Sequence, residues 1–332
     1  MRALVTGGTG FIGTHVVQTL VRHGVEVRVL VRTTSHWGTM ADLPVKPVLG
    51  DVLDPVSLAE ACRDVNLVMH AAADYRLWVP DPHRMYQVNV HGTDNVIQAA
   101  IRARVDRIVH TSSAVTVACR DDRPGTEEAF VQPDEGRSAY PRTKVIAEQT
   151  AWRWIRQGAP ITIVNPSTVV GPMDRRPTPT GRLIVDYLSG RLPAYLDAAL
   201  NWIDVRDVAE GHWLAATKGR AGERYLLSHQ NLSLGEFLAV LAQVCGRSAP
   251  RWRVPYPVAF AAAWAAEVWS RYRGGEPRAT REGVRMAAIP MRYDSGKAVQ
   301  ELGLPQTSIR TAAADAVRWF REHGHVNQGG GR

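Results

Sequence analysis

Short runs rich in valine and isoleucine alternate with longer amphipathic segments through the first two-thirds of the chain. The runs predict β-strands at residues 2–6, 25–31, 45–50, 65–72, 107–112 and 160–165. Helices are expected between them, near 11–23, 55–63, 83–104 and 138–157. Repeated strand-then-helix units place parallel strands in one sheet with helices on both faces. The pattern therefore predicts an α/β protein with a doubly wound parallel sheet.

The alternation breaks after Pro166. A stretch rich in proline, glycine and arginine, 171–181, precedes a helix, and a strand at 201–205 leads into another helix at 206–218. We expect one domain made of residues 1–165 plus 201–230 and a second lobe made of 166–200 plus 231–322. Residues 323–332 include three consecutive glycines and are predicted to form a flexible tail.

Composition adds a question about charge. The 332 residues are 45% hydrophobic and 22% charged, as in a folded protein, and the net charge is +8. An anionic partner could be nucleic acid, lipid or a phosphorylated metabolite. Residues 251–332 hold thirteen Lys and Arg against seven Asp and Glu, so six of the eight surplus charges lie there. With no helix-turn-helix or finger pattern, we expect no nucleic-acid partner; an anionic metabolite or a membrane surface fits better.

The cysteines, histidines and N-terminus contain no sign of export or of metal binding. Cys62, Cys119 and Cys245 form no CxxC pair, and the eleven histidines show no metal-ligand spacing. Residues 1–8 run directly into the first strand, without a signal-peptide pattern. We therefore expect a cytoplasmic protein without a metal site, with peripheral contact to the inner membrane face as a further option.

Three glycines mark a candidate nucleotide site. Gly7, Gly10 and Gly13 follow the first strand and open the first helix. Glycines there permit a tight turn and let backbone N–H groups approach a pyrophosphate at the helix N-terminus. The alternative is an ordinary tight turn, which the position of the motif disfavours.

The end of the second strand distinguishes NAD from NADP. An acid there binds the ribose 2′-hydroxyl of NAD, whereas an arginine suits the 2′-phosphate of NADP. This chain has Arg32, followed by Thr33, Thr34 and Ser35, and no acid. The sequence therefore favours NADP(H) over NAD(H), although Arg32 could instead be a solvated surface residue. Asp51 and the alanines 71–73 follow later strands, where adenine and its ribose would lie.

Tyr140 and Lys144 are spaced to share one helix face. A nearby ammonium lowers the pKa of a phenol, which would make Tyr140 a proton donor and acceptor. Ser112 and Ser113 end a strand at the ligand-binding edge of the sheet. We favour Ser113 as the hydroxyl that shares the substrate oxygen; the alternative is that both serines only cap a turn.

Taken together, the motifs resemble the extended short-chain dehydrogenase/reductase family, also called the NAD-dependent epimerase/dehydratase family. They are Thr6-Gly-Gly-Thr-Gly-Phe-Ile-Gly13, Gly50-Asp51, His70-Ala-Ala-Ala73, Ser113, Tyr140-x-x-x-Lys144 and Asn165-Pro-Ser167. Residues 73–78, 177–181, 192–195 and 207–212 look most like the hopanoid-associated sugar epimerases, neighbours of the dihydroflavonol reductases.

The resemblance implies a Rossmann-type NADP(H)-binding domain, a smaller, mostly helical C-terminal substrate lobe, and a homodimer formed through helices 83–104 and 138–157. Ser113, Tyr140 and Lys144 would form the catalytic set, Lys144 would also hold the nicotinamide ribose, and residues 166–168 would flank the nicotinamide. The expected cofactor-binding residues are Gly7, Gly10, Phe11, Ile12, Gly13, Arg32, Asp51, Val52, Ala71, Ala72, Ala73, Lys144, Pro166 and Thr168.

The end of the second strand departs from the epimerase pattern. Epimerases that retain NAD resemble one another in having an acid at this position, whereas this chain has Arg32. We expect hydride transfer at a secondary alcohol or carbonyl of a sugar, polyol or lipid-linked substrate, by an epimerase or a reductase. One alternative is a dihydroflavonol-reductase-like enzyme acting on an aromatic or terpenoid ketone. Another is a dinucleotide-sensing protein without catalysis.

Two segments are candidate substrate or membrane contacts. Asp74, Tyr75 and Arg76 follow the fourth strand, and Arg182 follows the loop at 177–181; with Ser113 they are the expected substrate contacts, although both arginines could be surface charges. The apolar stretch 254–269 contains tryptophans, is edged by arginines and is too short to span a bilayer. The sequence favours a core between helices over a membrane surface for this stretch.

Overall fold

The computed structural model describes residues 1–76, 78–79, 81–119, 123–132, 139–273, 277 and 279–326. Its main sheet has seven strands, all parallel, in the order β10-β6-β5-β4-β1-β2-β3. They are β1 (Arg2–Thr6), β2 (Glu26–Val31), β3 (Val45–Leu49), β4 (Leu67–His70), β5 (Arg107–Thr111), β6 (Ile161–Pro166) and β10 (Arg224–Leu227). The predicted doubly wound, Rossmann-type sheet is confirmed.

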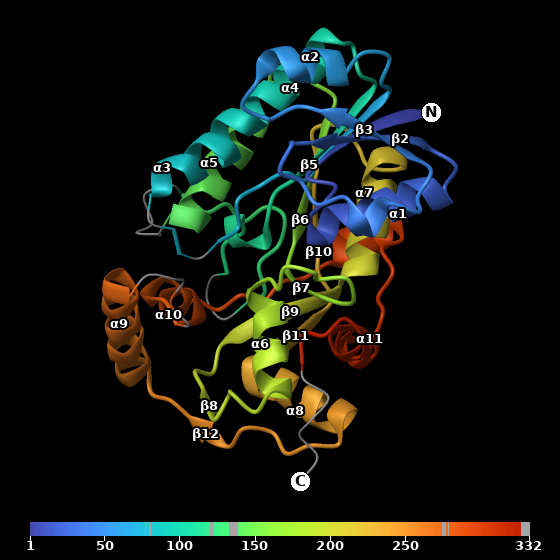
Figure 1. The fold of residues 1–332 in the computed structure, drawn as a ribbon. Helices are drawn as coiled ribbons and strands as arrows, with labels where there is room; N and C mark the ends of the chain where they lie inside the picture. Colours follow the sequence, from blue (N-terminus) through green and yellow to red (C-terminus); the bar gives the residue numbers. More distant parts are fainter. Residues whose placement is uncertain are drawn as a thin grey trace.

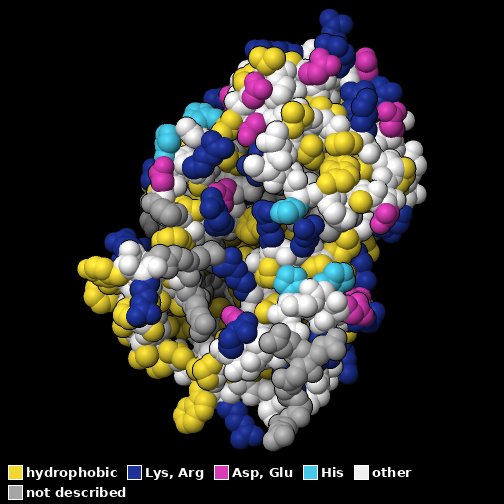
Figure 2. Space-filling model, viewed as in Figure 1, with side chains coloured by type: hydrophobic (Ala, Val, Ile, Leu, Met, Phe, Trp, Pro, Cys, Tyr) yellow, Lys and Arg dark blue, Asp and Glu magenta, His cyan; other side chains and the backbone are white. Residues whose placement is uncertain are grey.

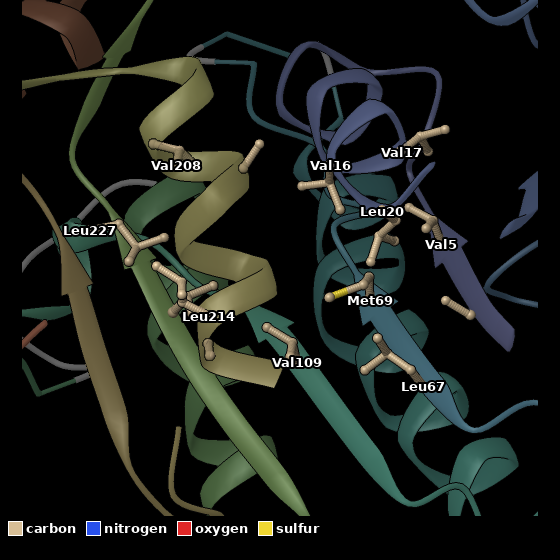
Figure 3. Close-up of a cluster of buried hydrophobic side chains, with 14 of the residues drawn as sticks. Val5, Val16, Val17, Leu20, Leu67, Met69, Val109, Val208, Leu214 and Leu227 are labelled. Atoms are coloured by element: carbon tan, nitrogen blue, oxygen red, sulfur yellow. The ribbon is translucent and has the colours of Figure 1, made fainter. Parts of the chain in front are cut away.

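Helices cover both faces of this sheet (Figure 1). On one face lie α1 (Phe11–Arg22) and α7 (Val205–Thr217); on the other lie α2 (Pro55–Ala61), α4 (Gly92–Arg102) and α5 (Ala139–Ile155). Side chains of β1 point alternately to the two faces of the sheet, because successive residues of a strand lie on opposite sides. Val5 packs with α1 and α7, as Figure 3 shows, whereas Leu4 packs with α2 and α4. The core therefore has two layers, one on each side of the sheet.

The predicted helix 83–104 is divided. It consists of α3 (Pro82–Tyr86), a π-helical turn η2 (Gln87–His91) and α4. The η2 turn places Asn89 so that its amide accepts a hydrogen bond from the Asp74 backbone N–H (2.7 Å) and donates to Thr143 Oγ1 (3.0 Å). The apolar pattern predicts a helix but does not distinguish α-helical from π-helical hydrogen bonds, so it does not predict this turn.

The rest of the chain forms a smaller part below the main sheet in Figure 1. Its three-stranded sheet has the order β11-β9-β7 and packs against α6 (Pro179–Leu188), α8 (Leu234–Cys245) and α11 (Ile309–Glu322). Short strands β8 (Ala194–Tyr195) and β12 (Trp252–Arg253) pair with each other, and α9 (Tyr256–Arg273) packs against α10 (Arg281–Ala287).

The segment 201–230 is shared between the two parts. β9 (Ala199–Asp204) pairs with β7 (Thr168–Val170) and β11 (Gln230–Ser233), outside the main sheet. α7 and β10 then return to the main sheet. The predicted tail 323–332 extends past Val326, so residues 327–332 lie outside the described residues.

Helix α9 departs from the sequence expectation of an inter-helix core. Only Ala263, Glu267 and Ser270 of its 18 residues are buried. Among the described elements its main neighbour is α10, and most of its residues are exposed or only partly buried. The composition of the segment is apolar enough for a core, but the tertiary structure leaves it on the outside.

A buried ion pair attaches α5 to the main sheet. Glu148 and Arg224 are both almost fully buried, and Arg224 Nη1 lies 2.7 Å from Glu148 Oε1. Glu148 also accepts hydrogen bonds from Ser112 Oγ, Thr116 Oγ1, Asn165 Nδ2 and Trp152 Nε1. The Arg224 guanidinium donates to the carbonyl oxygens of Glu127 and Ala129. Every charge and most donors are thus paired, which a buried pair requires in order not to destabilise the fold.

Glu148→Ala is expected to destabilise the protein by about 3–5 kcal/mol, because it leaves the Arg224 charge buried without its anion. Urea unfolding followed by circular dichroism measures the change. Glu60→Ala is the matched control, since it removes a carboxylate from the exposed Glu60–Arg63 pair and should barely move the midpoint. An equal effect of the two substitutions would contradict the account of Glu148.

Burial keeps two histidines of the main domain, His70 and His212, in their neutral form. Burial lowers the pKa of His70 to about 3, with a smaller contribution from the Lys144 charge, and burial lowers the pKa of His212 to about 4. The His70 ring lies 2.7 Å from Thr6 Oγ1 and 3.0 Å from Thr93 Oγ1. His212 Nε2 lies 2.9 Å from Thr111 Oγ1, and its Nδ1 donates to the Val208 carbonyl. Below pH 6.5 only the unfolded chain gains protons at these rings, so stability is lost as the pH falls.

His70→Gln should therefore make the protein less sensitive to acid. Between pH 6.5 and 5 the wild type loses up to about 2 kcal/mol through His70, and the variant should lack that part of the loss. The measurement is the difference in the free energy of unfolding between the two pH values. His23→Gln, at a half-exposed ring on α1's C-terminal side, is the control. Equal pH dependence in wild type and His70→Gln would show that His70 does not titrate on unfolding.

Candidate active site

One cavity of about 720 Å³ runs along the carboxyl ends of the main-sheet strands and continues into the smaller part. All of the predicted cofactor-binding residues line it, together with the predicted catalytic residues. They are Gly7, Gly10, Phe11, Ile12, Gly13, Arg32, Asp51, Val52, Ala71, Ala72, Ala73, Pro166, Thr168, Ser113, Tyr140 and Lys144. The fold thus brings together residues from six separate loops.

The glycine turn has no room for side chains. Gly7 has a positive φ of 71°, and a Cβ there would lie 2.6 Å from the backbone of Ala71 and Ala72. A Cβ at Gly13 would lie 2.1 Å from the Gly7 carbonyl oxygen. The turn leads into α1, whose first N–H groups have no partner within the helix and carry the positive end of its dipole. A pyrophosphate fits this position.

Arg32 lies at the opposite end of the nucleotide part of the cavity. Ser35 Oγ accepts a hydrogen bond from the Arg32 backbone N–H at 2.9 Å, and the Ser35 N–H donates to the Arg32 carbonyl at 2.9 Å. This tight turn keeps Arg32, Thr34 and Ser35 together on the cavity wall. The Arg32 side chain is exposed, which leaves its guanidinium accessible to a phosphate.

The two serines of the β5 end have different partners. Ser113 forms a side-chain hydrogen bond with Tyr140 and also caps the short helix η3 (Ala114–Thr116). Ser112 donates instead to the buried Glu148 carboxylate. Ser113 is therefore the hydroxyl that shares the cavity wall with the Tyr140 phenol. Ser113 therefore caps the turn and also contacts Tyr140, and its role in catalysis stays a prediction.

Lys144 is buried one helical turn beyond Tyr140. Its Nζ donates to the Thr111 carbonyl oxygen at 2.9 Å. Burial lowers the pKa of Lys144 to about 8, against the opposing effect of the nearby Glu148 charge. Lys144 therefore remains largely protonated at neutral pH, and it places a positive charge at the centre of the cavity.

The expected effect of Lys144 on Tyr140 is not found. Burial raises the pKa of Tyr140 above its ordinary value, and the Ser113 hydrogen bond opposes that rise. The expectation was wrong because spacing along a helix predicts a shared face but not the loss of solvation around the phenol. Tyr140 is accordingly a protonated phenol at neutral pH.

The predicted substrate contacts lie at different places. Tyr75 lines the cavity, whereas Asp74, Arg76 and Arg182 are not among its lining residues. Asp74 forms an ion pair with Arg76, and Arg182 Nε donates to the Pro177 carbonyl at 3.2 Å. Burial raises the pKa of Tyr75, and the charge of Arg182 acts against that rise, so Arg182 lies near the same region. Their roles in substrate binding stay predictions.

The sequence did not predict an apolar wall in the substrate half of the cavity. It is formed mainly by Leu183, Ala198, Leu200, Trp202, Leu234, Met286, Ala287, Met291 and Tyr293. These residues come from α6, β9, α8, α10 and the segment after α10, which no local motif connects. Asp174, Arg175 and Arg176 add polar groups, and burial raises the pKa of Asp174 to about 6.

Across the described ranges, no group of three or more His, Cys, Asp or Glu side chains is arranged to hold a metal ion. Cys62, Cys119 and Cys245 are all free thiols.

Comparisons with known proteins agree with this geometry. Residues 3–228 match the model of the NAD dependent epimerase/dehydratase family. A Synechocystis protein provisionally named dihydroflavonol 4-reductase is 43% identical over 97% of this chain and 95% of its own length. Sterol demethylase protein B of Methylococcus capsulatus is 36% identical over 98% of this chain and 100% of its own length.

A solved structure is similar over the whole fold. The nucleoside-diphosphate-sugar epimerase PA4631 from Pseudomonas aeruginosa superimposes with a TM-score of 0.83 and 27% identity, over 98% of this chain and 99% of its own. The family match covers the sheet, the glycine turn and the Tyr140 helix together. The chain therefore belongs to the NAD-dependent epimerase/dehydratase family, the extended short-chain dehydrogenases/reductases.

Proposed function

We propose that this protein is an NADP(H)-dependent oxidoreductase that interconverts a carbonyl and a secondary alcohol on a largely apolar, lipid-linked substrate. The observation that carries the proposal is the hydrogen-bonded pair of Ser113 and Tyr140 beside Lys144, in a cavity that also contains the glycine turn. One end of the cavity is suited to a dinucleotide, and the other end has an apolar wall.

The dinucleotide, when bound, supplies or accepts the hydride. Tyr140 donates a proton to the carbonyl oxygen during reduction, and its raised pKa suits this direction because the phenol is protonated at neutral pH. Ser113 orients the same oxygen through its hydroxyl. Lys144 keeps a positive charge on the wall of the same cavity, and the Thr111 carbonyl fixes the position of its ammonium group.

NADP(H) is the proposed cofactor because the tip of β2 carries an arginine and no acid. A guanidinium can form charge-assisted hydrogen bonds with a 2′-phosphate, and the Ser35 hydroxyl lies in the same turn. The glycines also suit a dinucleotide, since a turn without side chains at Gly7 and Gly13 lets backbone N–H groups approach a pyrophosphate.

The apolar wall favours a lipid-linked substrate over a free sugar. A sugar has hydroxyl groups that lose their hydration on burial and need many polar partners. The wall around Trp202, Met286 and Met291 offers chiefly carbon surface. A sugar or polyol attached to a hopanoid would belong to the proposed class, as would an apolar terpenoid ketone.

A second candidate function is that of an epimerase, which oxidises one substrate and then reduces the same molecule again. The solved sugar epimerase of the same fold favours it. The two functions differ in how the cofactor is held: NAD that copurifies and does not exchange would favour epimerisation. NADPH that is consumed in proportion to substrate would favour reduction.

Arg32→Ala should weaken NADP(H) binding about ten- to hundredfold and leave NAD(H) binding almost unchanged, because a hydrogen bond to a charged group is worth about 1.5–3 kcal/mol. Titration of nucleotide fluorescence measures both affinities. Arg28→Ala is the control, since Arg28 lies on the same strand but donates to the Arg63 carbonyl. An unchanged ratio of the two affinities would refute the NADP(H) assignment.

Tyr140→Phe should lower kcat for carbonyl reduction about 10²- to 10⁴-fold, because it removes the proton donor and little else. NADPH affinity should not change. Tyr187→Phe removes the hydroxyl of a buried tyrosine that bonds the Ser248 carbonyl and does not line the cavity, and it should retain full activity. Full biological activity of Tyr140→Phe would favour a dinucleotide sensor over an enzyme.

A further inference from the structure

Helix α9 presents aromatic and aliphatic side chains to solvent. Val258, Trp264, Trp269 and Tyr272 are between 54% and 86% exposed, and we call these four residues the aromatic face. Val258, Trp269 and Tyr272 lie on one side of the helix, since their spacings of 11 and 3 residues are close to whole turns. Trp264 extends this exposed surface about 80° around the helix from Tyr272. Figure 2 shows hydrophobic side chains gathered at the position of α9 in Figure 1.

The polarity of α9 is reversed compared with an ordinary surface helix. Its only carboxylate, Glu267, is buried and accepts hydrogen bonds from the Arg281 backbone N–H (2.7 Å) and from Arg281 Nε (2.8 Å). A helix that merely covers a core places its apolar stripe inward and its charges outward. Here the acid points inward and the large aromatic side chains point outward. Something apolar is therefore needed to cover the outer side.

Arginines surround the aromatic face. Arg251 and Arg253 precede α9, and Arg271 and Arg273 end it; all four are exposed. Glu267 is the single acid between residues 251 and 273, and its charge is already paired with Arg281. Asp197, outside this segment, pairs with Arg253 at 3.3 Å, so the positive charge of the surface comes chiefly from Arg251, Arg271 and Arg273. The Arg273 guanidinium lies over the Trp269 ring at 4.5 Å from its centroid. The surface is thus both aromatic and positively charged.

We propose that the aromatic face and its four arginines dock the protein onto an anionic phospholipid bilayer. Aromatic rings prefer the boundary between headgroups and acyl chains, and arginines bind anionic headgroups. None of the described helices is long and apolar enough to cross a membrane, so α9 would lie in the plane of the bilayer surface. A second copy of the chain fits the surface less well, because a two-fold contact would bring the same arginines against one another.

The docking surface adjoins the cavity. α9 packs against α10, and Gly283, Met286 and Ala287 of α10 line the apolar wall. A single helix therefore separates the bilayer from the substrate half of the cavity. If the proposed function holds, this arrangement lets an apolar substrate pass from the lipid to Tyr140 without crossing water; that route rests on the proposed function, whereas docking itself does not.

Flotation with vesicles tests the docking. The full chain should float with vesicles of equal phosphatidylcholine and phosphatidylglycerol and stay in the soluble fraction with phosphatidylcholine alone. Trp264→Ser with Trp269→Ser should weaken binding about tenfold or more, through loss of apolar contact. Arg271→Gln with Arg273→Gln should do the same through loss of charge.

The matched control is Leu49→Ser with Val56→Ser, which removes exposed apolar side chains (64% and 80% exposed) near α2, at the other end of the molecule in Figure 1. This variant should float as the wild type does. Failure of the wild type to float with either vesicle would overturn the proposal. So would a tryptophan variant that floats normally but sediments as a smaller species, since that result would assign the face to a second copy.

Activity is measured separately, as NADPH oxidation with a water-soluble aromatic ketone in the absence of vesicles. The tryptophan variant should match the wild type in this assay, because neither residue lines the cavity. Activity without flotation would refute docking alone. Flotation without activity in any vesicle or ketone assay would refute the proposed function alone.

Discussion

The position of α5, the helix that contains Tyr140 and Lys144, depends on one buried carboxylate. Glu148 lies two helical turns beyond Tyr140 on α5, and it accepts hydrogen bonds from residues at the ends of β5, β6 and β10. The attraction of Arg224 compensates the cost of burying this charge. Because Ser112 is one of the donors, the same contact fixes the β5 end and leaves Ser113 to face Tyr140. The Glu148 contacts thus fix the positions of Tyr140, Lys144 and Ser113, although none of these three residues takes part in them.

The cavity joins two environments that differ in polarity. At the sheet, the glycine turn, the α1 N-terminus and Arg32 provide backbone N–H groups and positive charge for phosphates. Towards α6 and α10 the wall is apolar, and beyond α10 lies the exposed aromatic face of α9. A substrate with a reactive oxygen and a large apolar body would place its polar end at Tyr140 and its apolar body against the smaller part.

The sequence predicted the main sheet well because its signals are local. The strand runs around Val5, Val68 and Ile163 are buried on both faces and therefore consist mainly of apolar residues. The glycine turn was predictable for a similar reason, because Gly7 has a positive φ and Gly13 approaches the Gly7 backbone closely within the same turn. The π-turn at Asn89 and the exposure of Trp269 were not predictable, since both depend on neighbours distant in the chain.

By itself, then, the sequence determined the parallel sheet, the dinucleotide cradle and the identity of the Ser113, Tyr140 and Lys144 candidates, because each is encoded by residue type at short spacing. The tertiary structure decided the rest. Burial raises the pKa of Tyr140, distant segments assemble the apolar wall, and Glu148 meets Arg224 across 76 residues. Desolvation and long-range packing control these features, and neither is a property of a local stretch of chain.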